Sequence, residues 1–257
     1  MSRERITSRS NPLIARLRRL KSQRAARRAE GVFHCEGPKM LAEALRWGAR
    51  LETVVCTQGV QLPELPGHVR VVEVPEDVLR TAADTQAPQG VVFLCRGTDL
   101  ALPLELEGSR FLVLDGVQDP GNVGTIWRSA DAFGADGLIL CPPCADPWSP
   151  KTVRATMGAV FRLPVWEATL EELADRLRLK GIPLYATALR QDTADARQVD
   201  LSRAAVVVGS EGRGVSPLAL ELSEKTVKIP MRARCESLNA GVAASVVLWE
   251  MARGGLI

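Results

Sequence analysis

The feature that most constrains the fold of this chain is a glycine-rich loop that follows a buried apolar run near the C-terminus. Val206–Val208 leads directly into Gly209–Gly214, which reads Gly-Ser-Glu-Gly-Arg-Gly. Three glycines in six residues let the main chain approach a neighbouring group closely, at an entropic cost that an ordinary surface turn does not require. A second run, Thr226–Ile229, stops at Pro230, and Ser237 then opens a long apolar helix. This order predicts a pocket built on backbone edges, although two βα connections of an ordinary α/β sheet are the alternative.

A second segment, upstream, combines a buried strand with a glycine-containing turn. Phe111–Leu114 is a continuous apolar run, which is typical of a strand buried on both faces. The turn 115–124 follows, and we expect a helix over roughly 122–134. Gly124 and Arg128 are four residues apart and share a face of that helix, so the glycine leaves room for a group to lie there. The alternative is that Gly124 only packs closely against a neighbouring strand.

Strands alternating with helices predict an α/β fold in two parts. We expect a small α/β domain over residues 1–96, a linker over 97–108 and a larger domain over 109–257. In the larger domain, strands separated by helices imply a parallel sheet with helices on both faces. The expected strands span residues 32–35, 51–56, 69–74, 90–95, 111–114, 138–141, 164–166, 184–187, 206–208 and 226–229. The further expected helices span residues 38–47, 76–83, 151–160, 170–180 and 239–251.

Basic residues are concentrated at the N-terminus. Residues 1–30 hold ten Lys or Arg and two Glu, so this end carries +8 and the rest of the chain −5. A basic block on a nearly neutral protein is typical of polyanion binding. Leu13, Leu17 and Leu20 recur at near-helical spacing, which predicts a helix docked by one face, with a solvated helix or a disordered arm as the alternative. We expect phosphate contacts from Arg16, Arg18, Arg19, Arg24, Arg27 and Arg28.

Composition indicates a cytoplasmic protein with reduced thiols. No apolar run approaches the roughly 18 residues that would span a bilayer, and the charged N-terminus does not resemble a signal segment. Cys141 and Cys144 have the spacing of a metal or redox pair, but there is no second such pair, and the histidines are His34 and His68. Since a structural zinc site needs about four ligands, we expect an ordinary thiol pair at a strand end and no metal.

Three motifs together resemble a known family. Residues 119–128 read Asp-Pro-Gly-Asn-Val-Gly-Thr-Ile-Trp-Arg, and 209–214 is the glycine loop. The third motif begins at Ile229-Pro-Met and ends at Ser237-Leu-Asn239. In order and spacing, these segments resemble the motifs of the TrmH (SpoU) branch of the SPOUT methyltransferases. Residues 1–95 more weakly resemble the small substrate-binding domain that precedes many members.

The resemblance implies a trefoil knot in the C-terminal domain, a homodimer and S-adenosylmethionine as methyl donor. It also implies 2′-O-methylation of a ribose in structured RNA, with ribosomal RNA favoured over transfer RNA. By similarity, the reaction site consists of Asn122, Arg128, Glu211, Ser237 and Asn239. The donor would be held by Gly209, Ser210, Gly214, Ile229, Met231 and Leu238.

The chemistry of methyl transfer bears on the role of Arg128. Transfer from a sulfonium to an alcohol is an in-line displacement, so the enzyme mainly positions the oxygen and stabilises the charge that develops on it. No histidine lies in the motif region, which removes the commonest general base. A guanidinium stays charged because its pKa exceeds ~12. We therefore expect Arg128 to clamp a phosphate and stabilise a developing alkoxide, and a general-base role is the alternative.

The other polar residues have structural alternatives. Asn122 and Ser237 could cap helices, Glu211 could be a solvated loop charge, and Asn239 could simply occupy a first helical turn.

Three other functions compete with ribose methylation. A Rossmann oxidoreductase would need G-x-G-x-x-G after its first strand, and Gly121–Gly124 lacks that spacing. A non-catalytic RNA-binding factor would explain the basic end but not five filled polar site positions. A base methyltransferase would use the same donor, and nucleoside analysis of the RNA would distinguish it.

Overall fold

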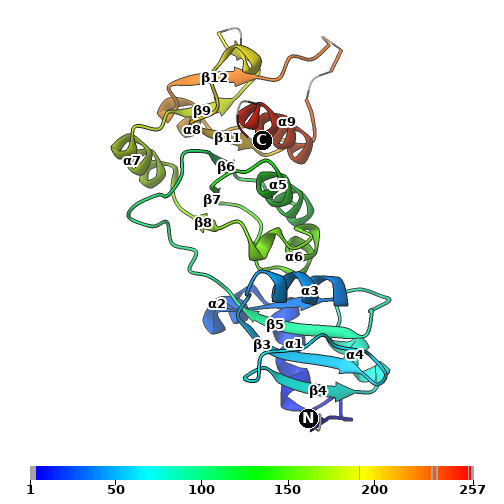
Figure 1. Cartoon of the computed structure of the whole chain (residues 1–257). Helices are drawn as coiled ribbons and strands as arrows, with labels where there is room; N and C mark the ends of the chain where they lie inside the picture. Colours follow the sequence, from blue (N-terminus) through cyan, green and yellow to red (C-terminus); the bar gives the residue numbers. More distant parts are fainter. Residues whose placement is uncertain (1–3, 191, 233, 236, 254, 256–257) are drawn as a thin grey trace. The chain divides into compact units, whose positions relative to one another are not determined.

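The computed structural model describes residues 4–190, 192–232, 234–235, 237–253 and 255, which form two compact units. The first unit comprises Met1–Thr98 and Asp146–Phe161, and the second comprises Asp99–Ala145 and Arg162–Ile257. The segment 146–161 clusters with the first unit, although it lies within the range that we expected for the larger domain. The expected linker 97–108 is divided between the units at Thr98 and Asp99. Figure 1 shows the order of the elements along the chain.

The first unit is built on a five-stranded mixed sheet. Its strand order is β1-β4-β3-β5-β2, in which β1, β4 and β3 pair in parallel while β5 runs antiparallel to both β3 and β2. The two-residue edge strand β1 was not expected from the sequence. The strands are β1 (Glu4–Arg5), β2 (Val32–Glu36), β3 (Leu51–Thr57), β4 (Arg70–Val74) and β5 (Val91–Arg96).

One face of this sheet is covered by α1 (Pro12–Ser22) and α4 (Glu76–Ala82). The leucines of α1 are buried against this face, as their spacing predicted. The basic helix is not continuous, however, because Gln23 adopts an extended conformation. A second short helix, α2 (Arg24–Glu30), follows it, and α3 (Pro38–Arg46) comes after β2.

The segment 146–161 packs against side chains of β2, which explains why it belongs to the first unit. It contains α6 (Pro150–Ala155) and a 3-10 turn, η1 (Ala159–Phe161). Phe33 of β2 stacks on Trp148, with ring centroids 4.7 Å apart, and on Phe161 at 6.3 Å. The helix expected over 151–160 ends early, because Met157 and Gly158 adopt positive φ values of 48° and 95°.

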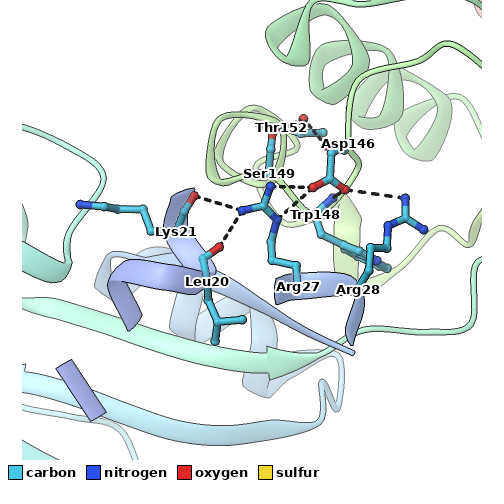
Figure 2. Close-up of polar contacts among 8 residues, drawn as sticks. All are labelled: Leu20, Lys21, Arg27, Arg28, Asp146, Trp148, Ser149 and Thr152. Carbon is cyan, nitrogen blue, oxygen red and sulfur yellow. Dashed lines mark hydrogen bonds and ion pairs between the residues drawn. The ribbon is translucent and has the colours of Figure 1, made fainter. Parts of the chain in front are cut away.

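A buried ion pair joins α2 to the same segment (Figure 2). The Nε and Nη2 atoms of Arg27 donate to Asp146 Oδ2 at 2.9 and 2.7 Å, and Nη1 donates to the carbonyl of Leu20 at 2.6 Å. The side chains of Arg27 and Asp146 are only 5% and 7% exposed. We expected Arg27 to contact a phosphate. Its guanidinium is instead buried and hydrogen-bonded to groups of the chain itself, so it is not exposed to a phosphate.

The second unit contains a seven-stranded sheet in which every pair is parallel, as the alternation of strands and helices predicted. The strand order is β10-β12-β9-β11-β6-β7-β8. The two-residue strand β10 and the helix α8 were not expected. The strands are β6 (Phe111–Asp115), β7 (Gly137–Cys141), β8 (Val165–Glu167), β9 (Leu184–Thr187), β10 (Ala194–Asp195), β11 (Ala205–Gly209) and β12 (Lys225–Lys228).

Helices cover both faces of this sheet (Figure 1). The helices α7 (Leu170–Lys180) and α8 (Pro217–Leu222) share a core cluster with Phe111, Val113 and Val207. On the other face, α5 (Pro120–Ala132) packs against α9 (Ala240–Ala252). A short 3-10 turn, η2 (Ala196–Gln198), follows β10.

Among the described residues, no helix has the length and apolar character needed to cross a bilayer.

We predict that Arg27→Met lowers the free energy of unfolding by ~3–5 kcal/mol, because it removes the two hydrogen bonds and the close positive charge that Arg27 brings to the buried Asp146 carboxylate. Arg80→Met is the matched control: Arg80 pairs with Glu76 at the surface, with side chains 62% and 69% exposed, so its loss should cost less than about 1 kcal/mol. Urea unfolding measures both changes. The double variant Arg27→Met/Asp146→Leu should recover most of the loss. Equal stability of Arg27→Met and Arg80→Met would contradict the importance of the buried pair.

Candidate active site

The loop after β11 closes tightly on itself. The N–H of Ser210 donates to the carbonyl of Gly214 at 3.1 Å, and the N–H of Gly214 donates to the carbonyl of Ser210 at 2.9 Å. A Cβ at Gly209 would lie 2.0 Å from the carbonyl carbon of Gly214, so only glycine fits there. Gly214 has a φ of +66°, which also favours glycine. Two of the loop glycines are therefore required by its geometry.

A cavity of about 310 Å³ lies at the carboxyl ends of β9, β11 and β12. Glu211 and Ser237, which were assigned to the reaction site, also line it. All six residues assigned to the donor line this cavity, namely Gly209, Ser210, Gly214, Ile229, Met231 and Leu238. The ends of three strands thus meet around one space.

Three polar side chains form a hydrogen-bonded chain beside this cavity. Asn239 Nδ2 donates to Asn122 Oδ1 at 3.2 Å, and Asn122 Nδ2 donates in turn to Glu211 Oε1. These residues come from the start of α9, the first turn of α5 and the loop after β11. Since Glu211 also lines the cavity, the chain connects the cavity wall to the two helix ends.

The helix caps differ from the sequence-based alternatives. Asp119 is the N-cap of α5, and its carboxylate accepts the N–H of Asn122 at 2.9 Å. The Asn122 side chain is consequently available to Glu211, so the alternative of Asn122 as a cap is wrong. Asn239, not Ser237, caps α9, and its Oδ1 accepts the N–H of Gly241 at 2.9 Å. Asn239 therefore combines a structural role with its contact to Asn122.

Arg128 lies apart from this hydrogen-bonded chain. It is on an exposed position of α5, and its guanidinium makes no hydrogen bond or ion pair with the residues that the structure describes. Ser237 is also exposed, and among the described residues its hydroxyl bonds none of the other predicted site residues. The structure thus brings together Asn122, Glu211 and Asn239, whereas Arg128 remains unengaged within one chain.

Sequence reasoning missed part of the cavity wall. Thr187, Ala188 and Leu189, at the carboxyl end of β9, line it as well. The sequence could have indicated these residues, because a strand was expected over 184–187 and ligands in parallel sheets bind at the carboxyl ends of strands. What the sequence did not reveal is that β9 lies between β11 and β12.

The cysteine pair beside β7 has the character of buried thiols. Cys144 Sγ donates to the carbonyls of Leu114 and Cys141, at 3.3 and 3.1 Å. Burial raises the pKa of Cys144 to about 11 and also raises the pKa of Cys141, so both stay protonated at neutral pH. Within the part of the chain that the structure describes, no group of three or more His, Cys, Asp or Glu could hold a metal ion.

Comparison with protein families gives two matches. Residues 109–249 match the SpoU rRNA Methylase family. Residues 11–92 match the MRM3-like substrate binding domain. The first match spans all the candidate site residues from Asn122 to Asn239, and the second spans the basic helices.

Individual proteins are similar over nearly the whole chain. The 23S rRNA (guanosine(2553)-2′-O)-methyltransferase RlmP of Bacillus subtilis is 31% identical over 86% of this chain and 88% of its own length. The AdoMet-bound rRNA methyltransferase from Sinorhizobium meliloti is 33% identical, with a TM-score of 0.87 over 99% of both chains. The SpoU methyltransferase AviRb from Streptomyces viridochromogenes, in complex with AdoMet, is 27% identical, with a TM-score of 0.85 over 95% of this chain and 97% of that one.

Proposed function

Because the chain belongs to the SpoU rRNA Methylase family, we propose that it is an S-adenosylmethionine-dependent enzyme that methylates a ribose 2′-hydroxyl of ribosomal RNA in the cytoplasm. The observation that carries this proposal is the hydrogen-bonded chain Asn239–Asn122–Glu211. It reaches the wall of the cavity of about 310 Å³, which we call the donor cavity. A non-catalytic RNA-binding factor would not need these three polar side chains to converge beside a cavity.

The donor cavity suits the proposed methyl donor. Its volume of about 310 Å³ is at the lower end of the range for small-molecule sites, about 300–1,000 Å³. Leu189, Ile229 and Leu238 supply apolar contacts for an adenine ring, and the loop at Gly209 brings backbone groups close to it. These residues would hold the donor, which supplies a methyl group on a sulfonium.

The polar chain would orient the attacking hydroxyl. An in-line displacement requires the ribose oxygen to lie opposite the departing sulfur, which is a matter of positioning. Asn122 and Asn239 sit at the ends of two packed helices, so their amides are held in fixed places. The Glu211 carboxylate, anchored by Asn122, can accept a hydrogen bond from a ribose hydroxyl. Ser237, on the same cavity wall, can contribute a further hydroxyl contact.

Arg128 would act as a phosphate clamp and stabilise charge on the attacking oxygen. Its guanidinium is permanently charged, which suits these roles better than that of a base. It is exposed and unpaired among the described residues, so it is available to a group outside its own chain. Proton loss to water or to a phosphate oxygen completes this scheme.

The first unit would bind RNA through its exposed arginines. Arg18 and Arg24 are exposed on α1 and α2, and Arg28 is partly exposed. Arg16 pairs with Glu30 and Glu52, and the hydrogen bond to Glu52 raises the pKa of Arg16. Arg19 pairs with Glu30 at 2.5 Å. In this proposal Arg18 and Arg24 are the principal phosphate contacts because both lie exposed on the two basic helices.

Assembly as a homodimer is part of the proposal. Helix α9 buries one side against its own sheet and exposes Val242, Val246 and Trp249, at 50%, 40% and 59%. These three side chains line a shallow cavity with Thr125 of α5. A second copy of the chain would cover this apolar surface and could bring its Arg128 to the partner's site. The family resemblance supports this assembly and also a trefoil knot around the donor cavity.

We predict that the purified protein transfers a methyl group from S-adenosylmethionine to ribosomal RNA from a strain lacking it, and that nucleoside analysis finds a 2′-O-methylated nucleoside. Asn122→Ala should lower turnover by ~10²–10³-fold, because it removes an oriented amide from the reaction site. Donor binding by calorimetry should be unchanged, since Asn122 does not line the donor cavity. A methylated base would contradict ribose methylation. Donor binding without transfer to any RNA would favour a non-catalytic factor.

For the RNA-binding helices, the double variant Arg18→Gln/Arg24→Gln should weaken RNA binding. Each lost phosphate contact should reduce the slope of log affinity against log salt by about 0.7–0.9. Arg80→Gln, on α4 of the same unit, is the control and should leave the slope unchanged. Filter binding across salt concentrations measures this. An unaltered slope in the double variant would mean that the two arginines do not contact phosphates.

For the dimer, Val246→Glu should produce monomers that lack activity, because a twofold interface would bury two unpaired charges. Leu179→Glu is the control, since Leu179 is 82% exposed on α7, which covers the opposite face of the sheet from α9. Sedimentation equilibrium distinguishes the two variants. Mixing Arg128→Ala with Asn122→Ala subunits should restore one intact site if Arg128 serves the partner. Full activity of a wild-type monomer would contradict the assembly.

A further inference from the structure

A second and larger cavity lies beside the donor cavity. Its volume is about 680 Å³, and residues at the carboxyl ends of β6 and β7 and the first turn of α7 line it. Ser210, Glu211 and Gly214 line both cavities, so the loop after β11 forms a common wall. The strand order reverses at β6, which lies between β7 and β11, and ligands in such sheets bind at this switch point.

Two carboxylates determine what this cavity can hold. Asp115 is only 8% exposed; its Oδ2 accepts the N–H of Ser216 at 2.6 Å, and its Oδ1 has no partner among the described residues. Glu171, in the first turn of α7, is exposed and bonds no described side chain. Two negative charges oppose the entry of a phosphate and favour a ligand that brings N–H donors.

The other lining residues suit a flat ring. Pro142 and Pro143, from the turn after β7, and Leu218, from α8, present apolar surface to the cavity. Arg213, an exposed residue of the loop after β11, offers a positive charge to a phosphate that the sugar of a nucleotide carries outside the carboxylate-lined part of the cavity. A nucleobase has this shape and chemistry. Guanine in particular presents two adjacent N–H donors on its Watson–Crick edge, which one carboxylate can accept in parallel.

We propose that this cavity receives the base of the nucleotide to be methylated and selects guanine through Glu171, with Asp115 as the deeper acceptor. Enzymes that modify nucleotides commonly extrude the target from its stack and read the edge of its base in a pocket. The inference rests on the proposed function, because the common loop would then place the ribose of that nucleotide beside the donor cavity.

The test is calorimetric titration of GMP into the full chain saturated with S-adenosylhomocysteine, which keeps nucleotides out of the donor cavity. GMP should bind about tenfold more tightly than IMP, which lacks the 2-amino group, and than AMP. Glu171→Arg should weaken GMP binding by about tenfold or more. Glu172→Arg is the matched control, because Glu172 is exposed in the same helical turn and does not line the cavity.

Several results would overturn the inference. These are no detectable binding of GMP at millimolar concentration, equal affinity for the three nucleotides, or equal GMP binding by Glu171→Arg and the wild-type protein. GMP should also inhibit methylation of ribosomal RNA competitively toward RNA. Inhibition that is not competitive toward RNA would indicate an effector site for free nucleotide and would equally overturn it. Failure of S-adenosylhomocysteine to bind would contradict the proposed function instead, and the nucleotide titrations would still decide the nature of this cavity.

Discussion

The parallel pairing of β6 with β11 is the interaction on which the candidate site depends. Its register joins Phe111 to Ala205 and Asp115 to Gly209, so two strands that are distant in the sequence end at the same level. Because the strands run in one direction, the loops that follow them leave from the same edge of the sheet. Asp115 then accepts the N–H of Ser216, which ties the loop after β11 to the end of β6. Both cavities border this junction.

The second condition is the packing of α5 against α9. The hydroxyls of Ser129 and Ser245 lie 2.8 Å apart between the two helices, and Phe133 meets Trp249 edge to face. This packing sets the relative positions of the helix starts, where Asn122 and Asn239 meet. The asparagine side chain is short, so the positions of the two helices fix where its amide group lies. Positioning of this kind is what a displacement reaction requires of a protein.

In the first unit, burial divides the basic residues into different roles. Arg27 is enclosed by the carbonyls of Leu20 and Lys21 and by Asp146, whereas Arg18 and Arg24 remain exposed. A buried guanidinium without a partner is costly, and the two hydrogen bonds that Arg27 donates to Asp146 Oδ2 offset that cost. The same residue type is thus buried in an ion pair at one position and exposed on the surface at others.

The sequence by itself determined the main strands, because continuous apolar runs such as Phe111–Leu114 are typical of strands that are buried on both faces. It also determined the tight loop, since Gly209 and Gly214 occupy positions that other residues would not fit. The residues assigned to the methyl donor could be named in advance because two motifs, 209–214 and 229–239, resemble those of a known family.

Only the tertiary structure decided the rest. The two-residue strands β1 and β10 have too few residues for a periodic pattern, and they exist because a neighbouring strand supplies hydrogen bonds. The segment 146–161 joins the first unit because Phe33 stacks on Trp148 and Arg27 pairs with Asp146, contacts between residues that no local pattern connects. The larger cavity likewise arises where α7, α8 and two strand ends meet. Local sequence sets conformation, but which charges are buried and which surfaces enclose a space depends on packing between distant segments.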